Sequence, residues 1–300
     1  NMKTQIYSFI NVRYADYDPS KVISLQLISF TDSGREEYET YIRPYNGLLI
    51  DKGYLSTLGF DIIKVLAAPS FPDIYKKIEP YLNGANVFYH NSSSIFALKS
   101  ICHHYGLGVP EAKWINTETI VRRTWEEFRQ GGFGLLQMRS FLNIDPSANF
   151  ATTTAAIVVK ASQKWGTDID DMIDLAEMSS DRYYTKLHGH CRPSNKADLS
   201  ACEGNPDGPF YGHTIVFTGK LDRQRSELRE LAVKLGFNFA DTVNKNTTML
   251  VVGTYDNPTV MTVGKSSKQL KAEKMNAEGK AEIQIMSSDT FYKMIEDANK

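Results

Sequence analysis

The chain has 300 residues, 42% of them hydrophobic, and a formal net charge of −1 at pH 7. This length predicts two domains, each large enough for its own core, and the balanced charge excludes a strong overall field that would draw the chain to nucleic acid. Three cysteines (Cys102, Cys191 and Cys202) exclude a disulfide framework and favour a reducing, cytoplasmic setting. No apolar stretch reaches membrane-spanning length, so no membrane partner is expected. The sequence does not indicate an oligomeric state.

The first half opens with three predicted strands. The alternating run Gln5–Val12 is followed by Val22–Phe30 and Glu36–Ile42, with a turn at Thr31–Gly34, which makes an antiparallel meander. Helices and one short buried strand then alternate. The helices are predicted at Phe71–Leu82, Ser93–Tyr105, Thr117–Trp125, Leu135–Leu142 and Thr152–Ser162, and the strand at Asn86–Tyr89. This order predicts an α/β fold with a mixed sheet.

In the second half, a buried strand leads through a hydroxyl and a glycine into a helix. The apolar run Ile215–Phe217 ends at Thr218-Gly219, and leucines then recur at helical spacing from Leu228 to Leu235. Backbone N–H groups at such a helix start can hold a phosphate. The alternative is a strand, turn and helix that only pack. Further strands are predicted at Met249–Val252 and Ile283–Ile285, and further helices after Gly264 and through Phe291–Ile295.

This succession resembles a BRCT domain over about ninety residues. The motifs that carry the resemblance are the TG pair after the first strand, Leu235-Gly236 at the end of the first helix, TTMLVVG, and SSKQLKA on the second helix. It departs from the family pattern at Met275-Asn276 and at Phe291, where a Trp is usual. The resemblance, which is greatest to the BRCT domains of bacterial NAD-dependent DNA ligases and clamp loaders, implies a small α/β domain with a parallel sheet.

In the phosphate-binding members of this family, the TG pair and two basic residues hold the phosphate. Matched by motif, the resemblance implies a site made of Thr218, Gly219, Arg225 and Lys271. Lys268 is an alternative to Lys271, because the second helix cannot be registered to better than one turn. The ligase-like character favours a DNA 5′ phosphate over a phosphopeptide.

The first half resembles the DEDD-type 3′–5′ exonucleases of the polymerase III epsilon class, which have an RNase H-like fold. The matching segments cover about residues 4–162 and include TYIRPYNG, LAAPSFPDIYKKIEPYL, VFYHNSS, CHHYGLGVP, INTETIVRRTW, LLQMRSFLNI and ANFATTTAAIVV. Enzymes of this class hold two Mg²⁺ or Mn²⁺ ions between four carboxylates, with a histidine as general base.

Every one of those five catalytic positions is replaced in this chain. The residues that stand there are Asn11, Arg13, Ile95, Asn149 and Thr154. We therefore expect no catalytic residue, no metal site and no cofactor; Mg²⁺ or Mn²⁺ is expected only if other acids rescue activity. Asp16, Asp18 and Asp145 are the candidates for rescue, and the alternative is that the first two shape a loop.

The two resemblances divide the chain into an exonuclease-like domain at 1–165, a linker at 166–210 and a BRCT domain at 211–300. The linker holds His188, His190, Cys191 and Cys202, which are zinc-ligand types at a spacing that matches no named zinc motif.

The sequence favours a non-catalytic DNA-binding or scaffold protein of replication or repair. It would use a pseudo-exonuclease domain and a phosphate-binding BRCT domain, with 5′-phosphorylated DNA ends and replication or repair proteins as partners. The groove of the first domain would still bind a nucleic-acid end or a protein surface; the alternative is that the groove has no binding role and the domain serves dimerisation or partner docking. One alternative is an active 3′–5′ exonuclease with non-standard metal ligands, and another is a protein-only adaptor.

Overall fold

The computed structural model describes residues 5–16, 18–45, 50–129, 131–183, 204–254 and 264–298. The chain forms two compact units, and each is discontinuous in sequence. The first comprises Asn1–Thr124 and Gln137–Ala176, and the second comprises Trp125–Leu136 and Glu177–Lys300. The division at residues 165 and 210 stays a prediction, and the second unit takes in a short segment from the first half of the chain.

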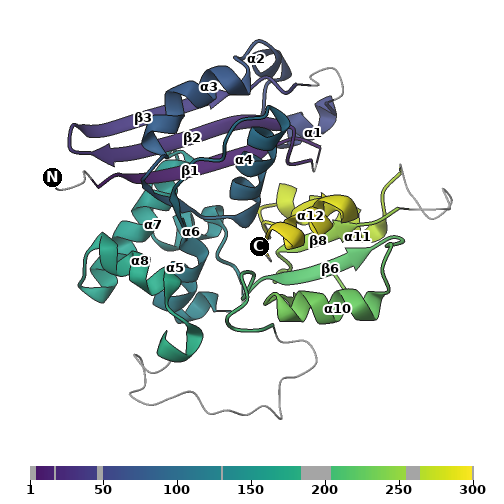
Figure 1. Cartoon of the computed structure of the whole chain (residues 1–300). Coiled ribbons are helices and arrows are strands. Elements are labelled where there is room, and N and C mark those ends of the chain that lie inside the picture. The colour runs from purple at the N-terminus through teal and green to yellow at the C-terminus, as the bar shows by residue number, and fades with distance from the viewer. Residues whose placement is uncertain are drawn as a thin grey trace. The chain divides into compact units, whose positions relative to one another are not determined.

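The first unit is built on a five-stranded sheet with the order β3-β2-β1-β4-β5 (Figure 1). β2 pairs antiparallel with both β1 and β3, while β4 runs parallel to β1 and to β5. The predicted meander and mixed sheet are thereby confirmed. The strands are β1 (Tyr7–Tyr14), β2 (Val22–Thr31), β3 (Gly34–Tyr41), β4 (Asn86–Tyr89) and β5 (Lys113–Asn116).

Helices connect and cover these strands. They are α1 (Lys52–Thr57), α2 (Ile62–Leu66), α3 (Phe71–Ile78) with the 3₁₀ turn η2 (Glu79–Tyr81), α4 (Ser92–His104), α5 (Thr117–Thr124), α6 (Leu135–Phe141), α7 (Phe150–Trp165) and α8 (Ile169–Glu177). The turn η3 (Glu126–Phe128) and the first two residues of α6 belong to the second unit. No helix within the described ranges has the length and apolar character that crossing a membrane requires.

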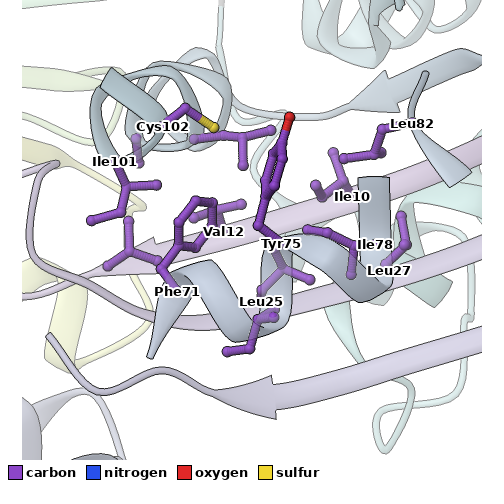
Figure 2. Packing of buried hydrophobic residues seen from close by; sticks show 14 of the residues in the cluster. Ile10, Val12, Leu25, Leu27, Phe71, Tyr75, Ile78, Leu82, Ile101 and Cys102 are labelled. Atoms are coloured by element: carbon purple, nitrogen blue, oxygen red, sulfur yellow. The ribbon is translucent and has the colours of Figure 1, made fainter. Parts of the chain in front are cut away.

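Alternate side chains of β1 face opposite sides of the sheet. Ile10 and Val12 face α3 and α4, where they pack with Phe71, Tyr75 and Ile101 in the main core of the unit (Figure 2). The odd-numbered residues of the strand face the other side, where α7 contacts β1 and β2. Phe9 stacks there on Phe88 of β4, with ring centroids 4.8 Å apart. The polar residues that follow Phe9 on this side are therefore held between the sheet and α7.

The second unit contains a four-stranded parallel sheet with the order β7-β6-β8-β9. This confirms the predicted small α/β domain. Its strands are β6 (Thr214–Thr218), β7 (Asn238–Phe239), β8 (Met249–Val252) and β9 (Gln284–Ser287), and its helices are α10 (Arg225–Lys234), α11 (Ser267–Ala277) and α12 (Ser288–Ala298). β6 is buried along its whole length. Its Phe217 packs edge-on against Phe291 of α12.

Candidate functional site

Four of the five residues that the sequence matches to exonuclease positions lie at the carboxyl end of β1 and at the start of α7. Asn11 is opposite Gln26 on β2, and Gln26 is opposite Glu39 on β3. Gln26 Oε1 accepts a hydrogen bond from the Phe150 N–H (2.9 Å), and Gln26 Nε2 donates one to Glu39 Oε1 (2.8 Å). A row of amide and carboxylate side chains therefore crosses the sheet beneath the first turn of α7.

Asn11 is only 8% exposed, and its Oδ1 has no hydrogen-bond partner among the residues that the structure describes. A buried acceptor without a partner costs about 1–3 kcal/mol. An amide at this position provides one neutral oxygen, whereas a hard divalent cation needs several anionic oxygens. Asn11 is therefore a neutral, polar residue that is poorly suited to hold such a cation.

Arg13 follows on the same face of β1. Its guanidinium carbon lies 4.6 Å from the centroid of the Phe60 ring and 5.6 Å from that of the Phe150 ring. Both distances are within the range of cation–π attraction. A positive charge therefore lies at the position that the sequence resemblance matches to a carboxylate, and it would oppose the binding of a metal cation there.

The first turn of α7 uses Asn149 and Thr154 for its own hydrogen bonds. Asn149 is the N-cap, since its Oδ1 accepts from the Thr152 N–H (2.8 Å), and its Nδ2 donates to Glu39 Oε2 (3.0 Å). Thr154 is fully buried and donates to the Phe150 carbonyl (2.8 Å). Both side chains thus form hydrogen bonds with the backbone at the start of α7.

Ile95 does not join the other four positions. It lies on α4 and packs in the main core with Ile10 and Val12, on the side of the sheet opposite Asn11. The neighbouring Ser94 fixes the end of β1, because its Oγ accepts from the Val12 N–H and donates to the Val12 carbonyl, both at 2.9 Å. The structure therefore places Asn11 and Arg13 on the sheet face that α7 covers, and Asn149 and Thr154 at the start of α7, whereas Ile95 is a core residue on α4.

The three acids considered for rescue are held by local contacts. Asp16 pairs with Lys21 (2.8 Å) and accepts from the Asp51 N–H, and Asp18 accepts from the backbone and hydroxyl of Ser20. Hydrogen bonds from Ser147 lower the pKa of Asp145. Within the described part of the chain, no three His, Cys, Asp or Glu side chains are grouped to hold a metal ion. The four possible zinc ligands, His188, His190, Cys191 and Cys202, lie outside the described residues.

The candidate phosphate site lies at the carboxyl end of β6. Thr218 ends the strand, and its Oγ1 donates to Ser266 Oγ (3.1 Å), which in turn accepts from the Gln269 N–H at the start of α11. Gly219 has a φ of +79°, and a Cβ there would lie 3.1 Å from the backbone of Gly253. This close approach of two chain segments explains why a glycine follows Thr218.

Two basic residues converge on the same turn. Lys268 Nζ donates to the Phe217 carbonyl (3.1 Å), and the Arg225 guanidinium donates to the Gly219 carbonyl (3.3 Å). Burial lowers the pKa of Lys268, and the nearby charge of Arg225 lowers it further. The positive charges of Lys268 and Arg225 repel each other, and both lie beside the start of α10. An anion bound between them would reduce this repulsion.

Of the residues predicted for this site, the structure brings together Thr218, Gly219, Arg225 and Lys268. Lys271 lies nearly one turn further along α11 and is exposed. Sequence reasoning missed Ser266, which links Thr218 to the start of α11. Its signal was a serine three residues before Gln269, a spacing typical of a helix N-cap.

Residues 205–289 match the family model of the BRCA1 C Terminus (BRCT) domain. The chain carries a BRCT domain. Among curated proteins, it is 28% identical over 136 residues to a DNA ligase of Brachyspira hyodysenteriae, a match that covers 42% of this chain and 18% of the ligase. It is 42% identical over 50 residues to a DNA ligase of Pediococcus pentosaceus, covering 16% of this chain and 7% of that ligase. The matched stretches therefore span less than a fifth of these ligases.

Among solved structures, the chain is similar to a 3′-exonuclease described in 3′-end specific recognition of a histone mRNA stem-loop. The TM-score is 0.45 and the identity 16%, with 54% of this chain and 84% of the other covered. It is also similar to Escherichia coli exonuclease I in complex with an oligonucleotide, with a TM-score of 0.47 and 12% identity over 63% of this chain and 44% of the other.

Proposed function

We propose that this protein is a non-catalytic DNA-binding protein of replication or repair, whose BRCT domain binds a terminal phosphate. The cluster of Thr218, Arg225 and Lys268 at the end of β6 is the observation that supports this most. It combines a hydroxyl, two cations and the start of α10, whose N-cap residue Gln224 makes no side-chain capping hydrogen bond. These are the groups that hold a phosphate in charge-assisted hydrogen bonds.

The first unit supports the non-catalytic part of the proposal. Arg13 lies between two aromatic rings, and the side chains of Asn149 and Thr154 are engaged in α7. A metal-dependent exonuclease needs carboxylates at these places to hold its ions. The unit would therefore act as a pseudo-exonuclease, for which no cofactor is required.

The ligand proposed for the BRCT domain is a DNA 5′ phosphate. A terminal phosphate carries close to two negative charges at neutral pH, whereas a phosphodiester carries one, so two converging cations favour the chain end. The similarity of parts of the chain to two DNA ligases supports DNA over a phosphopeptide.

The test is a comparison of two DNA hairpins that differ only in a 5′-phosphate or a 5′-hydroxyl group. We expect the phosphorylated hairpin to bind at least about tenfold more tightly to the full chain, since a hydrogen bond to a charged group contributes about 1.5–3 kcal/mol. Arg225→Gln should remove most of this difference. Arg229→Gln, on the same helix and stacked on Phe239, is the matched control and should retain it. Equal affinity of the wild-type protein for the two hairpins would favour a protein-only adaptor instead.

A further inference from the structure

A segment from the first half of the chain belongs to the BRCT-containing unit. Residues Trp125–Leu136 group with the BRCT domain, although they lie between α5 and α6 in the sequence. We call this segment the strap. At its centre, Phe133 is 2% exposed, and its ring lies edge-on to His213, with centroids 5.2 Å apart and an interplanar angle of 86°.

His213 is itself part of the BRCT core. It is 3% exposed, its Nδ1 lies 3.0 Å from Thr248 Oγ1, and its ring lies 6.2 Å from that of Phe237. Phe133 therefore packs on an aromatic cluster whose members precede β6 and β7. A large apolar side chain buried in this way contributes to the stability of the unit that surrounds it.

Two more contacts extend along the strap. The Leu136 N–H donates to Glu282 Oε1 (2.7 Å), and the position of a Cβ on Gly131 would lie 3.7 Å from the Asn246 carbonyl. Asn246 shortly precedes β8, Glu282 shortly precedes β9, and His213 immediately precedes β6. Because these strands are parallel, all three contacts lie at the amino edge of the sheet.

The candidate phosphate site lies at the other edge. Thr218 ends β6, and the Gly253 N–H that follows β8 donates to the Thr218 carbonyl (2.9 Å). Five residues of strand separate the two edges by roughly 15 Å. Ligands of open parallel sheets usually bind at the carboxyl edge. The strap therefore occupies the amino edge and leaves the carboxyl edge accessible.

We propose that the strap is an integral part of the BRCT domain in this protein, a built-in partner that fills an aromatic docking surface at the amino edge of the sheet. The domain then extends beyond its family-matched residues, and its amino edge is closed to other partners. A BRCT fragment that begins after residues 184–203 would lack the strap and expose His213, on which Phe133 packs. His213 and its neighbours Phe210 and Phe237 form the aromatic docking surface.

Hydrogen exchange of the full chain, resolved by residue, tests this proposal. Phe133→Ala should accelerate exchange of the β6 and β8 amides by about a hundredfold, because truncating a buried phenylalanine removes several kcal/mol of stability. Amides of β1 and β2 should keep their wild-type rates. Phe141→Ala is the matched control, because Phe141 is 43% exposed on α6 within the first unit. It should leave β6 and β8 unchanged.

Glu282→Ala is a milder second variant. It removes the acceptor of the Leu136 N–H and should speed exchange of that amide about tenfold while the domain stays folded. The proposal is overturned if the Phe133 and Leu136 amides of the wild-type protein exchange as fast as an unfolded chain. It is also overturned if Phe133→Ala leaves the exchange of β6 and β8 unchanged.

Discussion

The two lysines proposed for the phosphate site can be separated by parallel substitutions. Lys268 Nζ is held against the Phe217 carbonyl beside Thr218, whereas Lys271 is exposed on α11. Lys268→Met and Lys271→Met remove the same charge from the same helix and keep a side chain of similar length. Any difference between them therefore reports the position of the charge.

A charged hydrogen bond to phosphate contributes about 1.5–3 kcal/mol, so Lys268→Met should weaken binding of 5′-phosphorylated DNA by about 10- to 150-fold. An exposed charge contributes no more than about 1 kcal/mol, so Lys271→Met should weaken it by about fivefold or less. Fluorescence anisotropy with labelled hairpins measures the affinities of both variants. All titrations use the same salt concentration of about 0.15 M, since affinities at different salt concentrations cannot be compared.

The Lys268→Met loss should disappear with a 5′-hydroxyl hairpin, because the contact is to the terminal phosphate. Thermal unfolding of each variant shows that the domain remains folded. If Lys271→Met costs as much as Lys268→Met, or if both hairpins lose affinity equally, the assignment of Lys268 to a terminal-phosphate site is wrong.

Three further predictions concern single residues. Ile95→Asp should lower the free energy of unfolding by about 3–5 kcal/mol at neutral pH, because burial raises the pKa of the new carboxyl above its value in the unfolded chain. The loss should shrink as the pH falls to about 4, where the unfolded carboxyl is protonated as well, while Ile95→Val should cost only about 0.5–1.5 kcal/mol. A chemical denaturation series would contradict this if the aspartate variant were as stable as the valine variant. Because the pKa of Lys268 is lowered, the affinity for the 5′ phosphate should begin to fall at a lower pH than it would with a lysine of ordinary pKa. Lys268→Arg should remove that fall, and a wild-type affinity that stays constant up to pH 10 would refute the prediction. Burial raises the pKa of Cys102 to about 12, so its thiol should resist a thiol reagent at pH 8 in the native protein and react on unfolding, as mass spectrometry of the labelled peptide would reveal.

The regular elements were predictable where a long run of residues is rich in apolar side chains. β1 and β2 have eight and ten residues, most of them buried, and the sequence predicts both. β5, α1 and α2 were missed, because they have only four, six and five residues and lack the apolar run of the equally short β4 and β8; β5 has one buried residue in four. A pattern this short does not distinguish a strand or helix from a loop.

The candidate phosphate site was predictable only in part. The sequence predicts the Thr218-Gly219 pair from its place between a strand and a helix. Lys268 and Lys271 were not separated, since residues three apart share a face of a helix and only burial distinguishes them. The contact between Phe133 and His213 joins residues eighty positions apart, and no local pattern indicates such a pairing.

We propose that the first unit binds no catalytic metal and does not cleave DNA. The most direct measurement is a calorimetric titration of the full chain with Mn²⁺, combined with a cleavage assay on labelled single- and double-stranded DNA in the same buffer. We predict no saturable heat of Mn²⁺ binding and intact DNA 3′ ends. Mn²⁺-dependent trimming of 3′ ends that is abolished by Asp16→Asn, Asp18→Asn or Asp145→Asn would contradict the account.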